Sequence, residues 1–229
     1  MPKTLLAIGA HYDDCVFGIP GILIQSARKH YRVVILSLIG DYTNWSPVKG
    51  REKAFVQGTI DISKEYGAEM QYLKYASHRF DVTPETKRAV AEVVADIQPD
   101  VAFLMWPQDH HHDHEVASVL SKIALRHSDR VLEQGPIRFP RFLYAYDNGP
   151  RHTIGFEPNV FVDVTAEWPM AMEWLGRFMA LMRGQKYDRE KPDSAVQTKE
   201  TLARYRGLTC GVRYAEALWA ANVHPQTIL

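Results

Sequence analysis

The sequence predicts an α/β fold built on a mainly parallel sheet. Short apolar runs, bounded by turn residues, alternate with longer segments of helical periodicity. Strand–helix–strand alternation requires crossover connections, and these place successive strands parallel to one another. The length of 229 residues suits one domain of this class. We therefore expect a single domain over residues 1–229.

The elements follow in order along the chain. Four buried strands are expected at residues 5–9, 32–38, 70–73 and 101–106, with helices between them at about 18–29, 47–66 and 84–97. The third helix has the clearest ends, because Thr83 can cap it, Pro84 suits its first position and Pro99 follows it. The second half adds a helix at about 113–126, strands at 138–146 and 160–164, and helices at about 167–186 and 194–205. This order predicts a Rossmann-like three-layer arrangement with a mainly parallel sheet.

Composition excludes several classes of protein. Hydrophobic residues make up 46% of the chain and charged residues 24%, which is typical of a globular protein and not of a disordered one. Lys and Arg total 27, as do Asp and Glu, so no basic excess is available for nucleic acid. The two cysteines, Cys15 and Cys210, form no disulfide framework, and no apolar run reaches the ~20 residues of a membrane helix. We expect a cytoplasmic protein without a nucleic-acid partner or a membrane span, and homo-oligomerisation stays open.

Two polar clusters follow the first and the fourth predicted strand. Residues 10–15 read Ala-His-Tyr-Asp-Asp-Cys, and residues 107–115 read Pro-Gln-Asp-His-His-His-Asp-His-Glu. Either cluster alone is explained as simply by solvated histidines or by helix-capping aspartates. In a doubly wound sheet, however, these two strands are neighbours, and ligands bind beyond their carboxyl ends. The two clusters are therefore expected to meet in one crevice, which favours a functional site.

The residue types in these clusters indicate a zinc centre. Imidazole and carboxylate ligands suit zinc, and three protein ligands with an open fourth position are typical of a catalytic site. His11 and Asp14 can turn toward one ion from a strand-to-helix loop, and either His114 or His111 can supply the third ligand. The other carboxylates are available for proton transfer or for orienting a histidine. One zinc ion per chain is expected, because one such ligand set can be assembled.

The two clusters also resemble the signature of the PIG-L/LmbE-like zinc-dependent de-N-acetylases. That signature is an Ala-His-Pro-Asp-Asp-Glu segment after the first strand and a His-Pro-Asp-His segment after a later one. Residues 10–15 and 111–114 match these segments, with Tyr12 in place of proline and Cys15 in place of glutamate. The resemblance implies a metal-dependent amidohydrolase. Its substrate would be an N-acylated amino sugar, glycoconjugate or related small molecule, most simply N-acetylated, and its products a free amine and a carboxylate.

Roles for individual residues come from the same resemblance. It implies that His11, Asp14 and His114 bind zinc. Asp13 would be the general base, a protonated His111 would stabilise the oxyanion, and Asp113 would orient His111. Arg51 is similar to a substrate-binding arginine of the family.

The loop after the second strand supplies further candidate substrate contacts. Tyr42 and Trp45 can stack on a sugar ring, and Asp41 directly follows the strand. Asp41 also lies where a dinucleotide-binding fold holds its ribose-binding carboxylate, so a non-catalytic metal- or nucleotide-binding protein is the alternative. The nearby glycines, at positions 9, 18 and 21, lack the Gly-x-Gly-x-x-Gly spacing of such folds. A metal phosphoesterase is a weaker alternative, since such enzymes usually need carboxylates for two ions.

Overall fold

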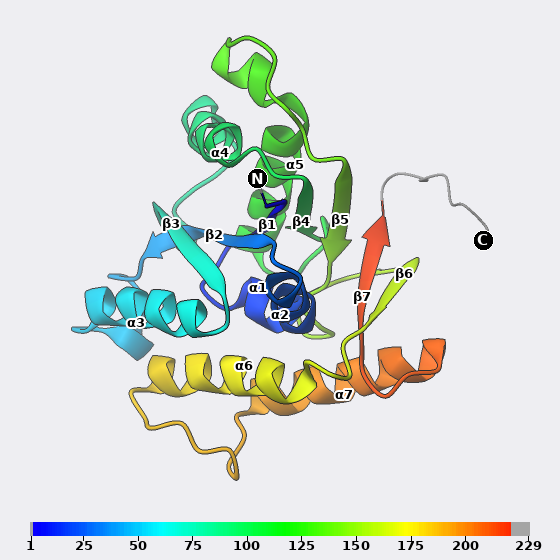
Figure 1. Cartoon of the computed structure of the whole chain (residues 1–229). Helices are drawn as coiled ribbons and strands as arrows, with labels where there is room; N and C mark the ends of the chain where they lie inside the picture. Colours follow the sequence, from blue (N-terminus) through cyan, green and yellow to red (C-terminus); the bar gives the residue numbers. More distant parts are fainter. Residues whose placement is uncertain (1, 221–229) are drawn as a thin grey trace, which may run out of the picture.

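The computed structural model describes residues 2–220 and contains a mixed α/β fold around a seven-stranded, mostly parallel sheet (Figure 1). The strand order is β3-β2-β1-β4-β5-β7-β6. The strands are β1 (Thr4–Gly9), β2 (Arg32–Asp41), β3 (Ala68–Ala76), β4 (Val101–Met105), β5 (Phe142–Tyr146), β6 (Val160–Asp163) and β7 (Ala215–Ala220). Strands β1 to β5 pair in parallel, whereas β7 runs antiparallel to both of its neighbours.

Helices lie on both sides of the sheet (Figure 1). Helices α4 (Pro84–Ile97) and α5 (His112–Leu132) pack together on one side, and α5 contacts β1 and β4. On the other side lie α1 (Asp14–Gly18), α2 (Pro20–Arg28) and α3 (Glu52–Glu65), the last preceded by the 3₁₀ turn η1 (Ser46–Val48). Helix α6 (Trp168–Arg183) packs on α2 and α3, and α7 (Ser194–Cys210) packs on α6 and β7. None of the described helices has the length and apolar character needed to cross a membrane.

The central strand β1 determines where the first polar cluster lies. All six of its residues are buried, because β2 and β4 flank it and helices cover both of its faces. Beyond Gly9 the chain turns at once into α1, and Asp14 folds back beneath the strand end. A Cβ atom on residue 9 would lie 2.8 Å from Cβ of Asp14, so glycine permits this close approach. The predicted adjacency of the first and fourth strands is confirmed by the pairing of β1 with β4.

Several predicted element ends are confirmed and others are wrong. The helix predicted at 84–97 is confirmed, with Thr83 Oγ1 accepting a hydrogen bond from Thr86 N at its start. The single helix predicted at 18–29 is two helices, because the chain leaves helical geometry at Ile19 before Pro20 restarts it. The helix predicted from 47 begins at Glu52, because Gly50 adopts a positive φ of 82°.

Strand β7 was not predicted, and a buried charge explains why. Glu216 is 1% exposed within it, which breaks the apolar pattern expected of a buried strand. Its carboxylate accepts hydrogen bonds from Gly21 N (2.9 Å) and Ile22 N (2.8 Å) at the start of α2, and Lys199 Nζ lies 3.5 Å away. Lys199 also donates to Gly18 O at 2.7 Å. This buried pair ties α7 and β7 to the segment that follows Asp14.

Candidate active site

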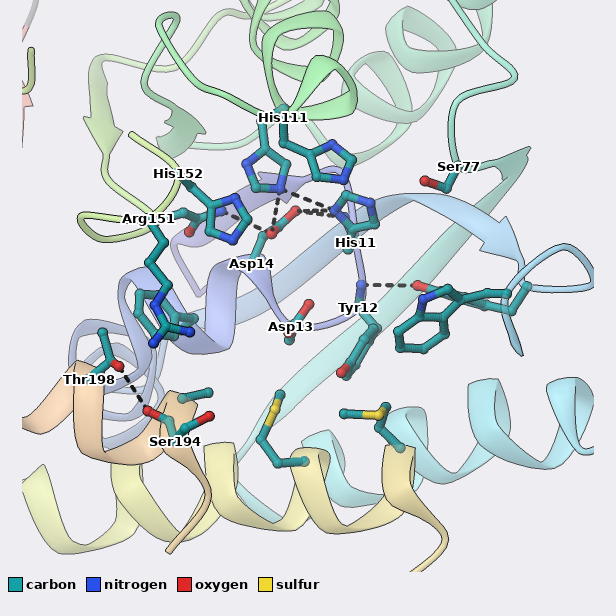
Figure 2. A pocket seen from close by; sticks show the side chains of 18 of the residues that line it. His11, Tyr12, Asp13, Asp14, Ser77, His111, Arg151, His152, Ser194 and Thr198 are labelled. Carbon is teal, nitrogen blue, oxygen red and sulfur yellow. Dashed lines mark hydrogen bonds and ion pairs between the residues drawn. The ribbon is translucent and has the colours of Figure 1, made fainter. Parts of the chain in front are cut away.

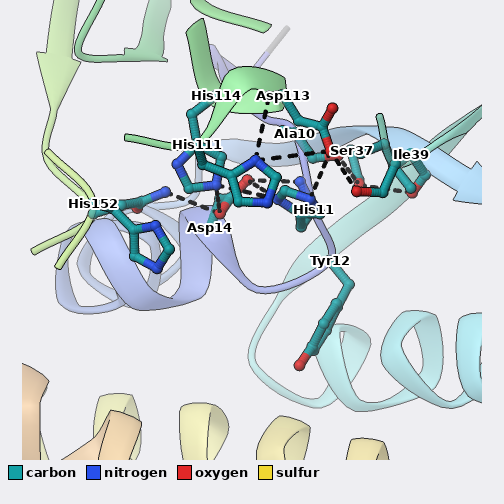
Figure 3. Close-up of polar contacts among 12 residues, drawn as sticks. Ala10, His11, Tyr12, Asp14, Ser37, Ile39, His111, Asp113, His114 and His152 are labelled. Atoms are coloured by element: carbon teal, nitrogen blue, oxygen red, sulfur yellow. Dashed lines mark hydrogen bonds and ion pairs between the residues drawn. The ribbon is translucent and has the colours of Figure 1, made fainter. Parts of the chain in front are cut away.

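The two polar clusters meet beyond the carboxyl ends of β1 and β4, as the strand order predicts (Figure 3). His11 and Asp14 come from the β1–α1 connection, where Asp14 Oδ2 accepts a hydrogen bond from His11 N at 2.6 Å. His111, Asp113 and His114 come from the first turn of α5, where His111 is the N-cap residue. Nδ1 of His11 lies 3.2 Å from Nε2 of His114 although 103 residues separate them.

His11, Asp14 and His114 bring ring nitrogens and carboxylate oxygens to distances close to those between the ligand atoms of a tetrahedral metal site. Besides the 3.2 Å contact between the two imidazoles, His11 Nδ1 lies 3.5 Å from Asp14 Oδ2, and His114 Nε2 lies 3.2 Å from Asp14 Oδ1. Metal–ligand bonds of ~2.0–2.1 Å at tetrahedral angles separate ligand atoms by roughly 3.3–3.4 Å. His111 also lies close, since His11, His111 and His114 each offer a ring nitrogen within 4.8 Å of the others. These residues therefore form a group that fits a metal ion.

Each of the three candidate ligands is held by a further polar group. Nε2 of His11 lies 3.3 Å from Asp113 Oδ2, and Nδ1 of His114 lies 3.1 Å from Asp109 Oδ1 without an aligned hydrogen bond. Asn148 donates from Nδ2 to Asp14 Oδ1 at 2.9 Å. Partners of this kind fix the orientation of metal ligands in proteins. No sequence motif points to Asn148, which lies 134 residues from Asp14.

We expect Asn148→Ala to lower metal affinity by ~10–100-fold, the usual effect of losing such a partner. The substitution removes the donor that holds Asp14 Oδ1 toward His114. Equilibrium dialysis with a chromogenic zinc chelator measures this change. Asn44→Ala removes another amide from the lining of the same pocket, one that donates to Ser77 O and contacts none of the three ligands; it serves as the control and should keep the wild-type affinity.

The electrostatic environment of the cluster favours a bound cation. Burial alone would lower the pKa of His11, but Asp14 and Asp113 outweigh it and raise the pKa to about 9. Asp14 and Asp109 likewise overcome burial and raise the pKa of His114 to about 10. Burial would raise the pKa of Asp14, yet the two imidazoles hold it well below its usual range. Carboxylates thus surround the ring nitrogens with negative charge.

Asp13 and His111 lie beside the three candidate ligands. Burial and the nearby Asp14 charge raise the pKa of Asp13 to about 6, and its side chain lines the pocket (Figure 2). Burial and the imidazoles of His11 and His114 lower the pKa of His111 to about 4. The backbone N–H of Asp113 donates to Nδ1 of His111 at 3.2 Å, which assigns the proton of a neutral His111 to Nε2.

Asp113, which the resemblance expects to orient His111, contacts both His111 and His11. Its Oδ2 lies 3.3 Å from His11 Nε2 and 3.8 Å from His111 Nδ1. The same carboxylate accepts hydrogen bonds from Ser77 Oγ at 2.6 Å and from His78 N at 2.9 Å. Four neighbours therefore fix its position, and it lies closer to the candidate ligand His11 than to His111.

The cluster opens into a pocket of about 490 Å³ (Figure 2). Apolar and aromatic side chains form much of its wall: Phe17, Tyr42, Trp45, Met179 and Met182. Tyr42 is only 3% exposed, and its hydroxyl accepts a hydrogen bond from Tyr12 N at 3.1 Å. Of the sequence-predicted aromatic contacts, Tyr42 and Trp45 therefore both reach the pocket, with Tyr42 packed into the scaffold.

Two other predicted substrate contacts lie outside this pocket lining. The Arg51 guanidinium donates to Leu181 O at 2.8 Å and also to Met182 O, the carbonyls at the C-terminal end of α6. A cation there complements the negative end of the helix dipole. Asp41 lies on the surface and accepts hydrogen bonds from Thr43 N (2.9 Å) and Oγ1 (2.7 Å). The structure brings neither residue to the metal-type cluster, by which we mean His11, Asp14, His111 and His114.

Cys15, which stands where the family signature has glutamate, points away from the cluster. Its sulfur is buried 3.3 Å from the hydroxyl oxygen of Tyr146, and burial raises the pKa of the thiol. We expect Cys15→Ser to keep metal affinity within a few-fold, because serine preserves a polar contact to Tyr146. Competition with a zinc chelator measures the affinity, and a collapse would place sulfur among the ligands.

Comparisons with solved structures identify the fold. The hydratase GalB from Pseudomonas putida KT2440, which acts on 4-carboxy-2-hydroxymuconate, matches with a TM-score of 0.80 at 19% identity over 99% of both chains. The conserved protein TT1542 from Thermus thermophilus matches with a TM-score of 0.80 at 22% identity, over 100% of this chain and 98% of that one. N,N'-diacetylchitobiose deacetylase from Pyrococcus horikoshii matches with a TM-score of 0.77 at 21% identity, over 98% and 88% of the two chains.

A match to a family model assigns the chain to a family, which similarity of fold alone does not do. The model described as PIG-L, GlcNAc-PI de-N-acetylase, matches residues 6–125. That span runs from β1 into α5, so it contains both polar clusters and every candidate metal ligand. With more than half of the chain matched, this protein belongs to the PIG-L family of de-N-acetylases.

Proposed function

We propose that this protein is a zinc-dependent hydrolase that removes an N-acyl group, most simply acetyl, from an amino sugar or a related small molecule. The observation that carries the proposal is the close approach of His11, Asp14 and His114, whose two ring nitrogens and two carboxylate oxygens make contacts of 3.2–3.5 Å beside Asp13 in the pocket lining. Membership of the PIG-L family supports de-N-acetylation of sugar-type substrates. His11, Asp14 and His114 would hold the zinc, one ion per chain. We also infer that the helices on both sides of the sheet form the Rossmann-like three-layer arrangement.

Bound zinc would polarise the acyl carbonyl and lower the pKa of a water molecule toward ~7. Asp13 accepts the proton of the attacking water and then delivers it to the leaving amine. A carboxyl group whose pKa lies at about 6 is suited to both transfers near neutral pH. The products are a carboxylate and a free amine.

In this proposal His111 acts as a neutral hydrogen-bond donor. The mechanism expected from the sequence uses a protonated His111, but burial and the imidazoles of His11 and His114 lower the pKa of this ring to about 4, which favours its neutral form. A neutral ring with its proton on Nε2 still donates one hydrogen bond to the developing oxyanion. Asp113 is itself held by the backbone N–H of His78. It positions the site through its contacts with His11 and His111.

The pocket wall suits one face of a sugar ring. Trp45, together with Met179 and Met182, supplies apolar area against the C–H face of such a ring, and the buried Tyr42 supports Trp45 from behind, with the two ring centroids 5.7 Å apart. Arg51 and Asp41 lie beyond this wall, so they would contact only a substrate that extends out of the pocket.

An assay of both products tests the proposed reaction. Purified protein supplied with one equivalent of zinc should release acetate and free amine in equal amounts from a panel of N-acetylated amino sugars. A protein that binds zinc but releases neither product would be the non-catalytic alternative. Because the hydratase GalB has the same fold, the panel includes 4-carboxy-2-hydroxymuconate with its absorbance followed. Turnover of that compound without acetate release from any sugar would contradict the proposal.

A further inference from the structure

Arg151 is a positively charged side chain in the pocket wall that the proposed reaction does not use. It extends from the β5–β6 loop toward Ser194 and Thr198 of α7, below His152 (Figure 2). Among the described residues that line the pocket, no other Lys or Arg occurs. Its guanidinium makes no hydrogen bond or ion pair within residues 2–220. An arginine without a partner in a substrate pocket is available to bind a ligand.

The loop that carries Arg151 is fixed to the metal-type cluster. His152 N and Thr153 N both donate to Gly149 O, at 3.1 and 3.0 Å, which closes a tight turn around Arg151. His110 N donates to His152 O at 2.8 Å, and this bond joins the turn to the segment that leads into α5. The adjacent Asn148 holds Asp14 through its amide. The turn therefore presents Arg151 at a set position relative to the candidate zinc ligands.

Arg151 has no acidic partner among the described residues that line the pocket. The acidic side chains in the lining are Asp13 and Asp14, and both belong to the metal-type end. Neither of them makes an ion pair with Arg151, so the positive charge of Arg151 has no partner among the described lining residues. Beside it, Ser194 at the start of α7 has only a long contact of 3.5 Å, from its hydroxyl to Asp193, so the hydroxyl is available to donate. An arginine with an adjacent hydroxyl donor is typical of a carboxylate or phosphate site.

We propose that the substrate carries an anionic group, a carboxylate or a phosphate, on its amine portion, and that Arg151 binds this group. The inference rests on the proposed deacetylase function for the identity of the reacting bond. Arg151 then determines specificity: it selects charged N-acyl compounds over neutral ones of the same ring size. Its contribution is to substrate binding, because it lies apart from the residues that touch the acyl group.

Matched substrates test this assignment. The neutral probe is N-acetylglucosamine, the carboxylate probe is N-acetylmuramic acid, and the phosphate probe is N-acetylglucosamine 6-phosphate. We expect at least one charged probe to have a KM at least ~10-fold below that of the neutral probe, as one charge-assisted hydrogen-bonded contact provides. Arg151→Gln should raise the KM of that probe by ~10–100-fold, with kcat and the neutral probe nearly unchanged. Whichever charged probe responds identifies the anion.

Arg88→Gln is the control, because it removes the same charge from the exposed face of α4, where Arg88 pairs with Glu92. It should leave the KM of every probe unchanged. Equal KM values for charged and neutral probes, or the same response from both variants, would overturn the assignment.

A binding measurement separates this inference from the proposed function. Calorimetry with the products glucosamine 6-phosphate and muramic acid requires no turnover. Binding of at least one product, weakened ~10–100-fold by Arg151→Gln, would support the anion site even if no acetate were released. The absence of any difference between wild type and Arg151→Gln would refute the anion site even if the deacetylase activity were confirmed.

Discussion

Asp13→Asn is expected to lower turnover by roughly 10²–10⁴-fold, the usual contribution of a positioned general base. Asparagine keeps the size of the side chain and its hydrogen-bonding capacity, but it cannot take the proton from water. Asp13 makes no contact with the ring nitrogens of His11 or His114 comparable to those of Asp14, so the variant should retain its metal. The measurements are acetate release at saturating substrate and zinc content by elemental analysis.

The pH dependence of kcat/KM tests the same role of Asp13 in the wild-type protein. A base with a raised pKa of about 6 works only when it is ionised, so kcat/KM should fall as the pH drops below that value. Asp13→Asn should remove this acidic limb from the residual activity. A full equivalent of zinc together with wild-type turnover in Asp13→Asn would show that another group serves as the base.

Asp14→Asn has the largest expected effect on metal binding. The substitution removes the charged ligand whose two oxygens face His11 Nδ1 and His114 Nε2 at 3.5 and 3.2 Å. His11→Ala and His114→Ala remove the other two ligands. All three variants should lose stoichiometric zinc, and activity should fall as a consequence. Excess zinc should partly restore the activity of Asp14→Asn, because two ligands remain.

His112→Ala is the matched control for these variants. His112 is exposed, lies between His111 and Asp113, and belongs to no metal-type group of the described residues. It should bind one equivalent of zinc as the wild type does. If Asp13→Asn lost zinc while Asp14→Asn kept it, the roles of the two adjacent aspartates would be reversed.

The convergence of the two clusters could be predicted because it depends on sheet topology. Alternation of strands and helices predicts that the first and fourth strands are neighbours, and the chain emerging from each must then reach the same edge. His11 and His114 meet for that reason. The helix at 84–97 was equally predictable, because Thr83 and Pro84 mark its start through local bonding.

The residues that support the site could not be predicted, because long-range packing places them. Asn148 reaches Asp14 only after β5 has paired with β4, which itself pairs with β1. Glu216 made β7 unrecognisable as a buried strand, because a buried carboxylate breaks the apolar pattern. The cost of burying its charge is offset by Lys199 and two backbone N–H groups from distant parts of the chain. For Arg51, no local sequence pattern indicates that its guanidinium donates to carbonyls at the end of α6.

A zinc titration of metal-free protein shows whether activity depends on one zinc ion bound by His11, Asp14 and His114. Acetate release from an N-acetylated substrate is measured as zinc is added, in parallel for wild type and Asp14→Asn. We expect wild-type activity to rise in proportion to zinc up to one equivalent and then to level off, while Asp14→Asn needs a large excess. Full acetate release by the metal-free wild type, or identical titrations for the two proteins, would rule out zinc bound by Asp14 as the source of the activity.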